Sequence, residues 1–144
     1  MLRNRDEIVL NIQEFVESLN HECKAGAIVA VEGKKDEIAL RILGLQGEIL
    51  VYNNFKGITN FVDYVARDGR KVILLLDRDK KGRTLTSKIF RKLSLLCPHD
   101  SLYYKKWFVK MTHGKIMCVE NLSNYCLPFA ENYSKTTFES RVVI

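Results

Sequence analysis

Short apolar runs alternate with amphipathic stretches along much of the chain. Residues 27–31, 48–52 and 72–76 are mostly apolar, and runs of this length are typical of strands covered on both faces of a parallel sheet. The stretches around them carry apolar residues at intervals of three and four, which predicts helices over residues 5–20, 34–43, 58–68 and 83–96. This alternation predicts a parallel sheet with right-handed crossovers.

The last third of the chain has a different pattern. Residues 102–104 and 107–109 are both strand-like, and we expect the second stretch to form a fourth strand. The aromatic side chains of this segment could stack on bases, but core packing is the favoured role. We also expect a short helix that starts near residue 119 and an additional edge strand over residues 141–144.

Carboxylates follow two of the expected strands. Glu32 comes directly after the first strand, and Asp77 and Asp79 come directly after the central one. In open α/β sheets the reactive crevice lies beyond the carboxyl ends of the strands. Alternate residues of an extended segment point the same way, so both aspartates can approach one ion, and magnesium takes such oxygen ligands. The pattern predicts a metal site, and the alternative is a solvated acidic loop.

The order of the strands follows from this site. Glu32 and the two aspartates can share one crevice only if the first and the third strand are neighbours in the sheet. That requirement predicts the strand order 2-1-3-4, with the site at the switch point.

The two acidic motifs also carry a family resemblance. The sequence V-E-G-K-K-D-E after one strand and L-L-D-R-D-K-K-G after a later one resemble the Toprim domain, which is shared by topoisomerases, bacterial-type primases, RecR-like recombination proteins and OLD-type nucleases. The resemblance implies an α/β, Rossmann-like Toprim fold. Its central four-stranded parallel sheet would have the order 2-1-3-4 and helices on both faces, with an N-terminal helix added. We expect an accessory helix at 1–24, the Toprim domain at 25–126 and a C-terminal extension at 127–144.

The resemblance implies a role for each motif residue. Asp77 and Asp79 would hold Mg²⁺ or Mn²⁺, and Glu32 would act as general acid or base or share the metal. The alternative for Glu32 is a carboxylate at a helix start that is satisfied by backbone N–H groups. Gly33 and Gly82 would let the chain turn. Phosphate contacts would come from the neighbouring cations, which are Lys34, Lys35, Arg78, Lys80, Lys81 and Arg83.

The charge of the chain is concentrated near the second motif. The formal net charge is +6, from 23 Lys and Arg against 17 Asp and Glu. Residues 67–92 alone contain ten basic and three acidic residues. A run of this kind is often only a solvated helix face, but here it surrounds the expected metal site. The pattern favours a polyanionic partner, DNA or RNA.

The leading functional expectation is a small metal-dependent nuclease of the Toprim type. A second hypothesis is a non-catalytic nucleic-acid-binding module that works with protein partners in a DNA-repair or RNA-processing complex. A third is a phosphatase, because L-L-D-R-D resembles the nucleophile motif of haloacid-dehalogenase-like enzymes. Those enzymes usually have this motif near the N-terminus, whereas here it lies at mid-chain. The phosphatase hypothesis also leaves Glu32-Gly33 unexplained.

Other classes of protein are disfavoured by composition. No stretch is apolar for long enough to span a bilayer, and the N-terminal residues are amphipathic, so we expect a cytoplasmic protein without a membrane partner. The four cysteines have no spacing typical of zinc sites, and we expect buried free thiols. They are Cys23, Cys97, Cys118 and Cys126.

Overall fold

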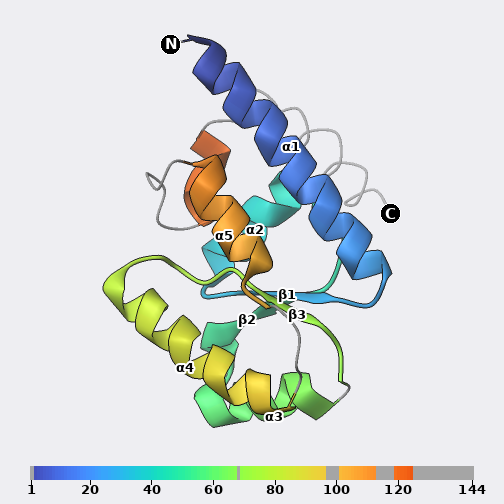
Figure 1. Ribbon diagram of the computed structural model, residues 1–144, viewed down its shortest axis with the longest axis vertical. Coiled ribbons are helices and arrows are strands. Elements are labelled where there is room, and N and C mark those ends of the chain that lie inside the picture. The colour runs from blue at the N-terminus through green and yellow to red at the C-terminus, as the bar shows by residue number, and fades with distance from the viewer. Residues whose placement is uncertain (1, 68, 97–100, 113–118, 125–144) are drawn as a thin grey trace.

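A small parallel sheet forms the centre of the molecule. The structure is a computed structural model that describes residues 2–67, 69–96, 101–112 and 119–124. Its strands are β1 (Ile28–Val31), β2 (Ile49–Val51) and β3 (Val72–Leu74), and all of them run parallel in the order β2-β1-β3 (Figure 1). Ala30 of the central strand lies opposite Leu50 on one side and Leu74 on the other.

Helices cover both faces of this sheet, so the molecule has three layers (Figure 1). One face carries α1 (Leu2–Lys24), α2 (Lys34–Ile42) and α5 (Tyr103–Met111). The other face carries α3 (Ile58–Arg67) and α4 (Lys80–Leu96). Two short 3₁₀ helices, η1 (Tyr52–Asn54) and η2 (Val119–Asn124), complete the described elements.

The strands divide their side chains between two hydrophobic clusters. Val29 and Ile73 pack with α1, α2 and α5, whereas Ile28 and Leu74 pack with α3 and α4. This division follows from the alternation of side chains across a pleated strand. Both faces are buried, which is why the strands read as continuous apolar runs and not as an apolar and polar alternation.

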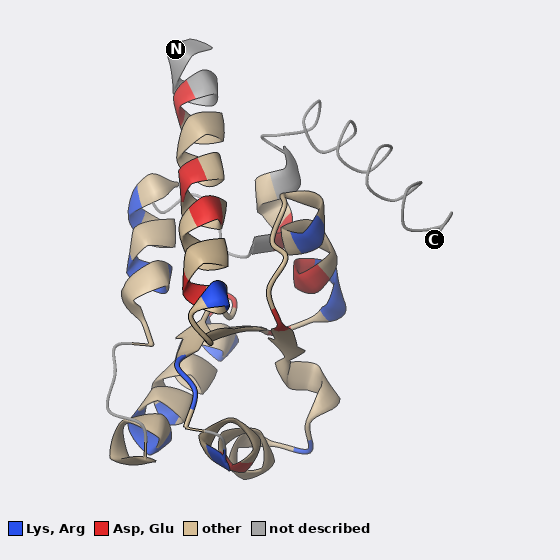
Figure 2. Ribbon diagram, turned by 90° about the vertical axis from the view of Figure 1, so that its right-hand side faces the viewer, with Lys and Arg blue, Asp and Glu red and all other residues tan. Residues whose placement is uncertain are grey.

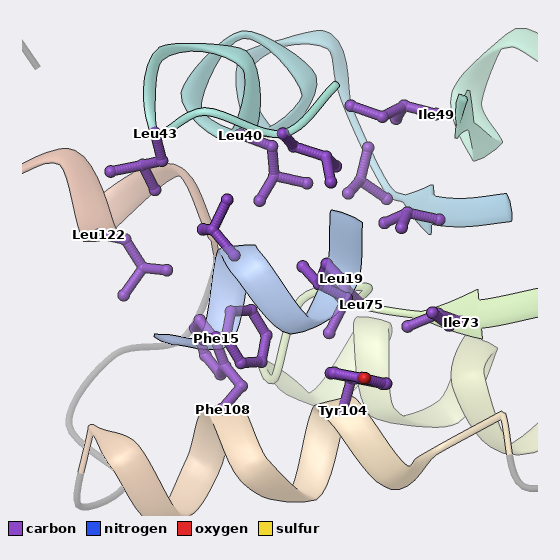
Figure 3. Packing of buried hydrophobic residues seen from close by; sticks show 14 of the residues in the cluster. Phe15, Leu19, Leu40, Leu43, Ile49, Ile73, Leu75, Tyr104, Phe108 and Leu122 are labelled. Atoms are coloured by element: carbon purple, nitrogen blue, oxygen red, sulfur yellow. The ribbon is translucent and has the colours of Figure 1, made fainter. Parts of the chain in front are cut away.

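Helix α1 is held by aromatic and aliphatic side chains in the first cluster. Phe15 and Leu19 are fully buried, and the Phe15 ring lies 5.9 Å from that of Tyr104 and 6.4 Å from that of Phe108, both of α5 (Figure 3). Burying each such side chain stabilises the fold by about 1.5–3 kcal/mol relative to exposure. The N-terminal helix therefore shares one core with the strands.

The expected four-stranded sheet is wrong, although the fold is α/β. Residues 107–109, which we expected to be the fourth strand, lie within α5. Tyr104, Phe108 and Met111 are spaced by four and three residues and are 2% to 5% exposed, so a helix places all three against the core. Aromatic residues favour strands only weakly, and this packing overrides that preference.

The edge of β3 shows what replaces the missing strand. The backbone N–H of Leu74 donates to the carbonyl oxygen of Ser101 at 2.9 Å, and Ser101 lies just before α5. The N–H of Leu75 donates to Ala30 at 2.8 Å, so the pairing with β1 continues one residue beyond β3. A single loop residue thus takes a place where a fourth strand would have paired.

Some expectations fall outside the described residues. These are the edge strand at 141–144 and Cys97, Cys118 and Cys126. Cys23 is a half-buried free thiol. No helix within the described ranges is long and apolar enough to cross a membrane.

Candidate functional site

Two of the expected site residues lie at the ends of neighbouring strands. Glu32 follows β1 directly, and Asp77 follows β3 after two further apolar residues. Because β1 and β3 are adjacent and parallel, their carboxyl ends meet at the same edge of the sheet. The negative charge of Glu32 is close enough to raise the pKa of Asp77. The structure therefore brings these two carboxylates into one electrostatic environment.

Each of the two side chains has a buried oxygen without a hydrogen-bond partner. Within the described part of the chain, Glu32 Oε1 and Asp77 Oδ1 are buried and accept no hydrogen bond. Glu32 as a whole is only 9% exposed. Buried polar atoms are nearly always paired, and an unpaired one indicates a missing water, an ion or a catalytic role. An ionised carboxylate is especially costly to bury alone.

The acid–base properties of Asp77 reflect this crowding. Burial, followed by the negative charges of Asp36, Glu32 and Asp79, raises the pKa of Asp77 to about 6. The positive charge of Lys105 acts in the opposite direction but does not cancel the effect. A cation placed beside these carboxylates would favour their ionised forms.

Asp36, in the first turn of α2, is a site residue that sequence reasoning missed. Its Oδ2 accepts the N–H of Gly33 at 3.2 Å, and its Oδ1 accepts the N–H of Glu120 at 3.0 Å. Burial raises its pKa, and these two hydrogen bonds oppose the shift. Asp36 thus holds the start of α2, the role that we considered as the alternative for Glu32. The signal was present, because an acid three residues after an N-cap is a known capping position.

Asp79 acts as the cap of α4. Asp79 directly precedes Lys80, the first residue of the helix, and its Oδ1 accepts the N–H of Gly82 at 2.7 Å. This bond uses one of its two carboxylate oxygens and satisfies one of the N–H groups that a helix start leaves unpaired. Asp79 also contributes to the raised pKa of Asp77, so it belongs to the same acidic environment.

The two motif glycines differ in what they allow. Gly33 has φ −130° and ψ 170°, an extended conformation that any residue adopts. Gly82 is buried inside the first turn of α4, where a Cβ atom would collide with the carbonyl oxygen of Asp77 and lie 2.7 Å from its carbonyl carbon. Glycine at position 82 therefore permits a close approach between helix and strand end, not a turn.

Lys105 of α5 is the second residue that sequence reasoning missed. Its Nζ donates to the carbonyl oxygens of Leu76 at 2.7 Å and Asp77 at 3.3 Å, and it lies 3.3 Å from Thr86 Oγ1. Burial, followed by the nearby charge of Arg78, lowers the pKa of Lys105 to about 8. Sequence reasoning gives no indication of this contact, because it interprets residues 102–104 and 107–109, on either side of Lys105, as strand-like.

A pocket of about 600 Å³ lies beside Glu32. One side is formed by η1 and the start of α3, and the other by the first three turns of α4, including Lys80 and Lys81. A second hollow of about 370 Å³ continues along α4 and includes Arg83 and Lys88. Helix α4 has six Lys and Arg residues and no acid (Figure 2).

The remaining predicted phosphate contacts are less closely associated with the pocket. Lys34 forms an exposed ion pair with Glu37 at 3.3 Å, and Lys35 is exposed in the first turn of α2. Arg78, which stands between the two aspartates in the sequence, is half-buried and lies close to Lys105. The cations of α4 are therefore the ones that the pocket brings together with Glu32.

The acidic residues do not form a large ligand cluster. Within the described ranges, no group of three or more His, Cys, Asp or Glu side chains is placed to hold a metal ion. The donor set that remains is the pair of buried, unpaired oxygens of Glu32 and Asp77. One or two carboxylates, completed by waters and phosphate oxygens, are the usual ligands of protein-bound Mg²⁺. The residues present fit that cation.

Similar proteins are known from several archaea. No protein-family model matches the chain. It is 36% identical over 94 residues to a UPF0292 protein of Thermoplasma volcanium, covering 65% of this chain and 77% of that relative. It is 35% identical over 114 residues to a UPF0292 protein of Methanosarcina barkeri, covering 79% of each.

A solved structure shares the fold. A putative protein from Aquifex aeolicus superposes with a TM-score of 0.61 at 24% identity, covering 75% of this chain and 94% of that chain. That likeness concerns the fold alone, whereas the identity to the archaeal relatives extends over most of their length. The chain belongs to the UPF0292 family.

Proposed function

We propose that the protein is a metal-dependent nuclease that hydrolyses phosphodiester bonds of DNA or RNA. The observation that carries this proposal is the pair of buried carboxylate oxygens, Glu32 Oε1 and Asp77 Oδ1, which lack partners at the ends of adjacent strands. Two such carboxylates repel each other in a low-dielectric site. A bound divalent cation would remove this repulsion and supply the missing partner.

Glu32 and Asp77 would hold Mg²⁺ or Mn²⁺, with Asp79 at the exposed side of the same acidic group. The ion would neutralise charge that develops on the phosphate and lower the pKa of a bound water. Glu32, the most buried of the three, would also move a proton during the reaction. Lys105 would keep the backbone of Asp77 in place through its hydrogen bond to that carbonyl oxygen.

The cations of α4 support nucleic acid as the substrate. Lys80 and Lys81 line the same pocket as Glu32, and Arg83 lies on the adjoining hollow. A cationic helix beside acidic groups attracts a polyanion that the carboxylates alone would repel. Phosphate contacts of this kind give affinity without reading sequence. A cytoplasmic location accompanies this proposal, because the substrates are found there.

The order of the motifs supports assignment to the Toprim domain. Glu32-Gly33 follows β1, and Asp77-Arg78-Asp79 follows β3, the strand that lies beside it. A second candidate function is a nucleic-acid-binding module without turnover that works with protein partners. The observation that favours it is that the described residues contain no three-membered acidic ligand group.

A cleavage screen separates the two candidates. Purified protein is incubated with single- and double-stranded DNA and RNA in Mg²⁺, Mn²⁺ or EDTA, beside the variants Asp77→Asn and Glu32→Gln. The control is Asp63→Asn, which changes an exposed carboxylate on α3. We expect metal-dependent cleavage that Asp77→Asn abolishes and that Glu32→Gln reduces by about 10²- to 10⁴-fold while nucleic-acid binding survives.

The opposite outcome is equally clear. A folded wild-type protein that binds nucleic acid and cleaves none of the four substrates would overturn the nuclease proposal and support the binding module. Undiminished cleavage by folded Glu32→Gln would remove Glu32 from the reacting groups.

A further inference from the structure

The pocket beside Glu32 has two walls of different chemistry. Tyr52 and Asn53 of η1, together with Ile58 of α3, form an aromatic, amide and aliphatic wall. The wall that α4 contributes has the ammonium-bearing side chains of Lys80, Lys81 and Lys88. A flat, partly apolar group and an anionic group are the two parts of a ligand that such walls would accept.

The size of the pocket limits what can enter. Its volume of about 600 Å³ lies within the range of about 300–1,000 Å³ that is usual for small-molecule sites. One nucleotide fits a space of this size, but a base pair within a duplex does not. A base that is paired and stacked must leave the helix before it can enter such a pocket, whereas an unpaired base enters without that cost.

The aromatic wall is backed by further rings. The ring of Tyr52 meets the fully buried ring of Phe61 edge-on at 5.4 Å, and Phe61 in turn meets Phe55 at 5.1 Å. A ring that is already held in place loses little conformational freedom when a base stacks on it. Stacking is tolerant of base identity, and removing one stacking ring typically weakens single-strand binding by about 5- to 150-fold.

The third element of the pocket is Glu32 itself. Its buried Oε1 lacks a partner among the described residues, and Glu32 belongs to the pocket lining together with the residues of both walls. The exposed amide of Asn53 can donate to and accept from a base edge. An unpaired nucleotide could then place its base against one wall and its phosphate against the other, with the carboxylate of Glu32 beside it.

We propose that this pocket binds one nucleoside phosphate unit, an unpaired nucleotide of a nucleic-acid strand, with the base against Tyr52 and a phosphate toward Lys80 and Lys81. The inference rests on the proposed function and narrows it, because the substrate becomes single-stranded DNA or RNA, or a frayed end, and not intact duplex. Tyr52 is then a binding residue that selects for strand state.

The test measures equilibrium binding in EDTA, where no cleavage occurs. The probes are an oligonucleotide that carries the fluorescent base 2-aminopurine, a blunt duplex of the same sequence and a free mononucleotide, each as DNA and as RNA. The variants are Tyr52→Ala and Asn53→Ala, and the matched control is Tyr64→Ala. Tyr64 is 45% exposed on α3, contacts Phe55 and does not line the pocket.

We expect the single strand to bind at least about 10-fold more tightly than the duplex, with quenching of 2-aminopurine by stacking. Tyr52→Ala should weaken single-strand binding by about 5- to 150-fold and should remove the quenching, and Tyr64→Ala should change neither. If Tyr52→Ala melts at a much lower temperature than wild type, Asn53→Ala decides, because this exposed residue can be shortened without loss of core packing. Weaker binding of the single strand by these variants, with unchanged binding of the duplex, supports the inference.

Three outcomes overturn it in different ways. Equal binding of single strand and duplex, unaffected by Tyr52→Ala and Asn53→Ala, rejects the inference and leaves the proposed function standing. Binding of no nucleic acid rejects both. A free mononucleotide that competes as well as the strand supports the nucleoside phosphate as ligand and rejects the strand as its source.

Discussion

Helix α4 approaches the end of β3 so closely that the carbonyl group of Asp77 occupies the space in which a side chain on Gly82 would begin. The N–H of the same glycine donates to Asp79. One residue without a side chain therefore sets both the distance between helix and strand end and the start of the cationic helix. The acidic and basic halves of the site depend on the same contact.

Gly82→Ala should damage stability and metal binding together. The added Cβ would force Asp77 or the first turn of α4 to move, which we expect to lower the free energy of unfolding by about 1–3 kcal/mol. Urea denaturation measures that change, and the Mg²⁺-induced shift in melting temperature measures the site. Ser87→Ala, at an exposed position of the same helix, should leave both near wild type. An unchanged Mg²⁺-induced shift in melting temperature in Gly82→Ala would contradict the proposal that Asp77 binds the metal ion.

Asp77→Asn should stabilise the metal-free protein, and the gain should depend on pH. The pKa of Asp77 is raised from 3.8 to about 6 in the folded state, so its ionisation opposes folding as the pH rises through that interval. Asparagine cannot ionise. Its melting temperature should exceed that of wild type near pH 7, and the difference should fade as the pH is lowered below about 4. Thermal melts in EDTA across this range test the claim.

The control for that experiment is Asp63→Asn, an exposed carboxylate of α3. A similar pH-dependent gain in Asp63→Asn would show that net charge, not the environment of Asp77, is responsible. In Mg²⁺ the order should reverse, since wild type gains the ligand and Asp77→Asn does not.

Lys105→Met should lower stability by about 1–3 kcal/mol. Methionine is also unbranched and only one atom shorter than lysine, but it leaves the carbonyl oxygens of Leu76 and Asp77 without their shared donor. Relief of the cost of burying the charge offsets part of this loss. Lys106→Met, which changes an exposed neighbour, should stay within about 0.5 kcal/mol of wild type. Equal denaturation curves for the two variants would mean that the Lys105 contacts contribute nothing.

Replacing Lys80, Lys81 and Arg83 by alanine should weaken nucleic-acid binding and reduce its salt dependence. Each lost phosphate contact lowers the slope of log affinity against log salt by about 0.7 for single strands. The comparison is a triple variant with the same change of charge at exposed cations of other elements, Lys24, Arg67 and Lys110. Matching slopes in the two triple variants would show that α4 is not the contact surface.

The sequence predicted the elements whose burial is uniform. Continuous apolar runs indicated β1, β2 and β3, and the acids that follow β1 and β3 were expected at one edge of the sheet. The spacing of apolar residues likewise indicated α2, α3 and α4, although α4 starts at Lys80, three residues before the expected boundary. Caps shift such boundaries, and here Asp79 provides the cap.

The rest depended on contacts between distant segments. Apolar residues are frequent between Tyr103 and Met111, and only the packing of Phe15 against Tyr104 and Phe108 shows which of them form the buried face of a helix. Lys105 reaches the end of β3 only because that segment is helical. Asp36 lies in the first turn of α2, but its bond to Glu120 joins residues 84 positions apart. Local sequence patterns do not predict contacts between residues that lie so far apart in the chain.

The bond between Leu74 and Ser101 has a consequence for the solution behaviour of the protein. Among the described residues the parallel sheet has three strands, with β2 and β3 at its edges, and an unpaired edge strand can recruit a strand from a second molecule. At the β3 edge the Leu74 donor is already used, and the chain then turns into α5, which packs against the sheet and cannot extend it. The substitution of a helix for a fourth strand therefore also acts as protection against edge-to-edge aggregation on that side.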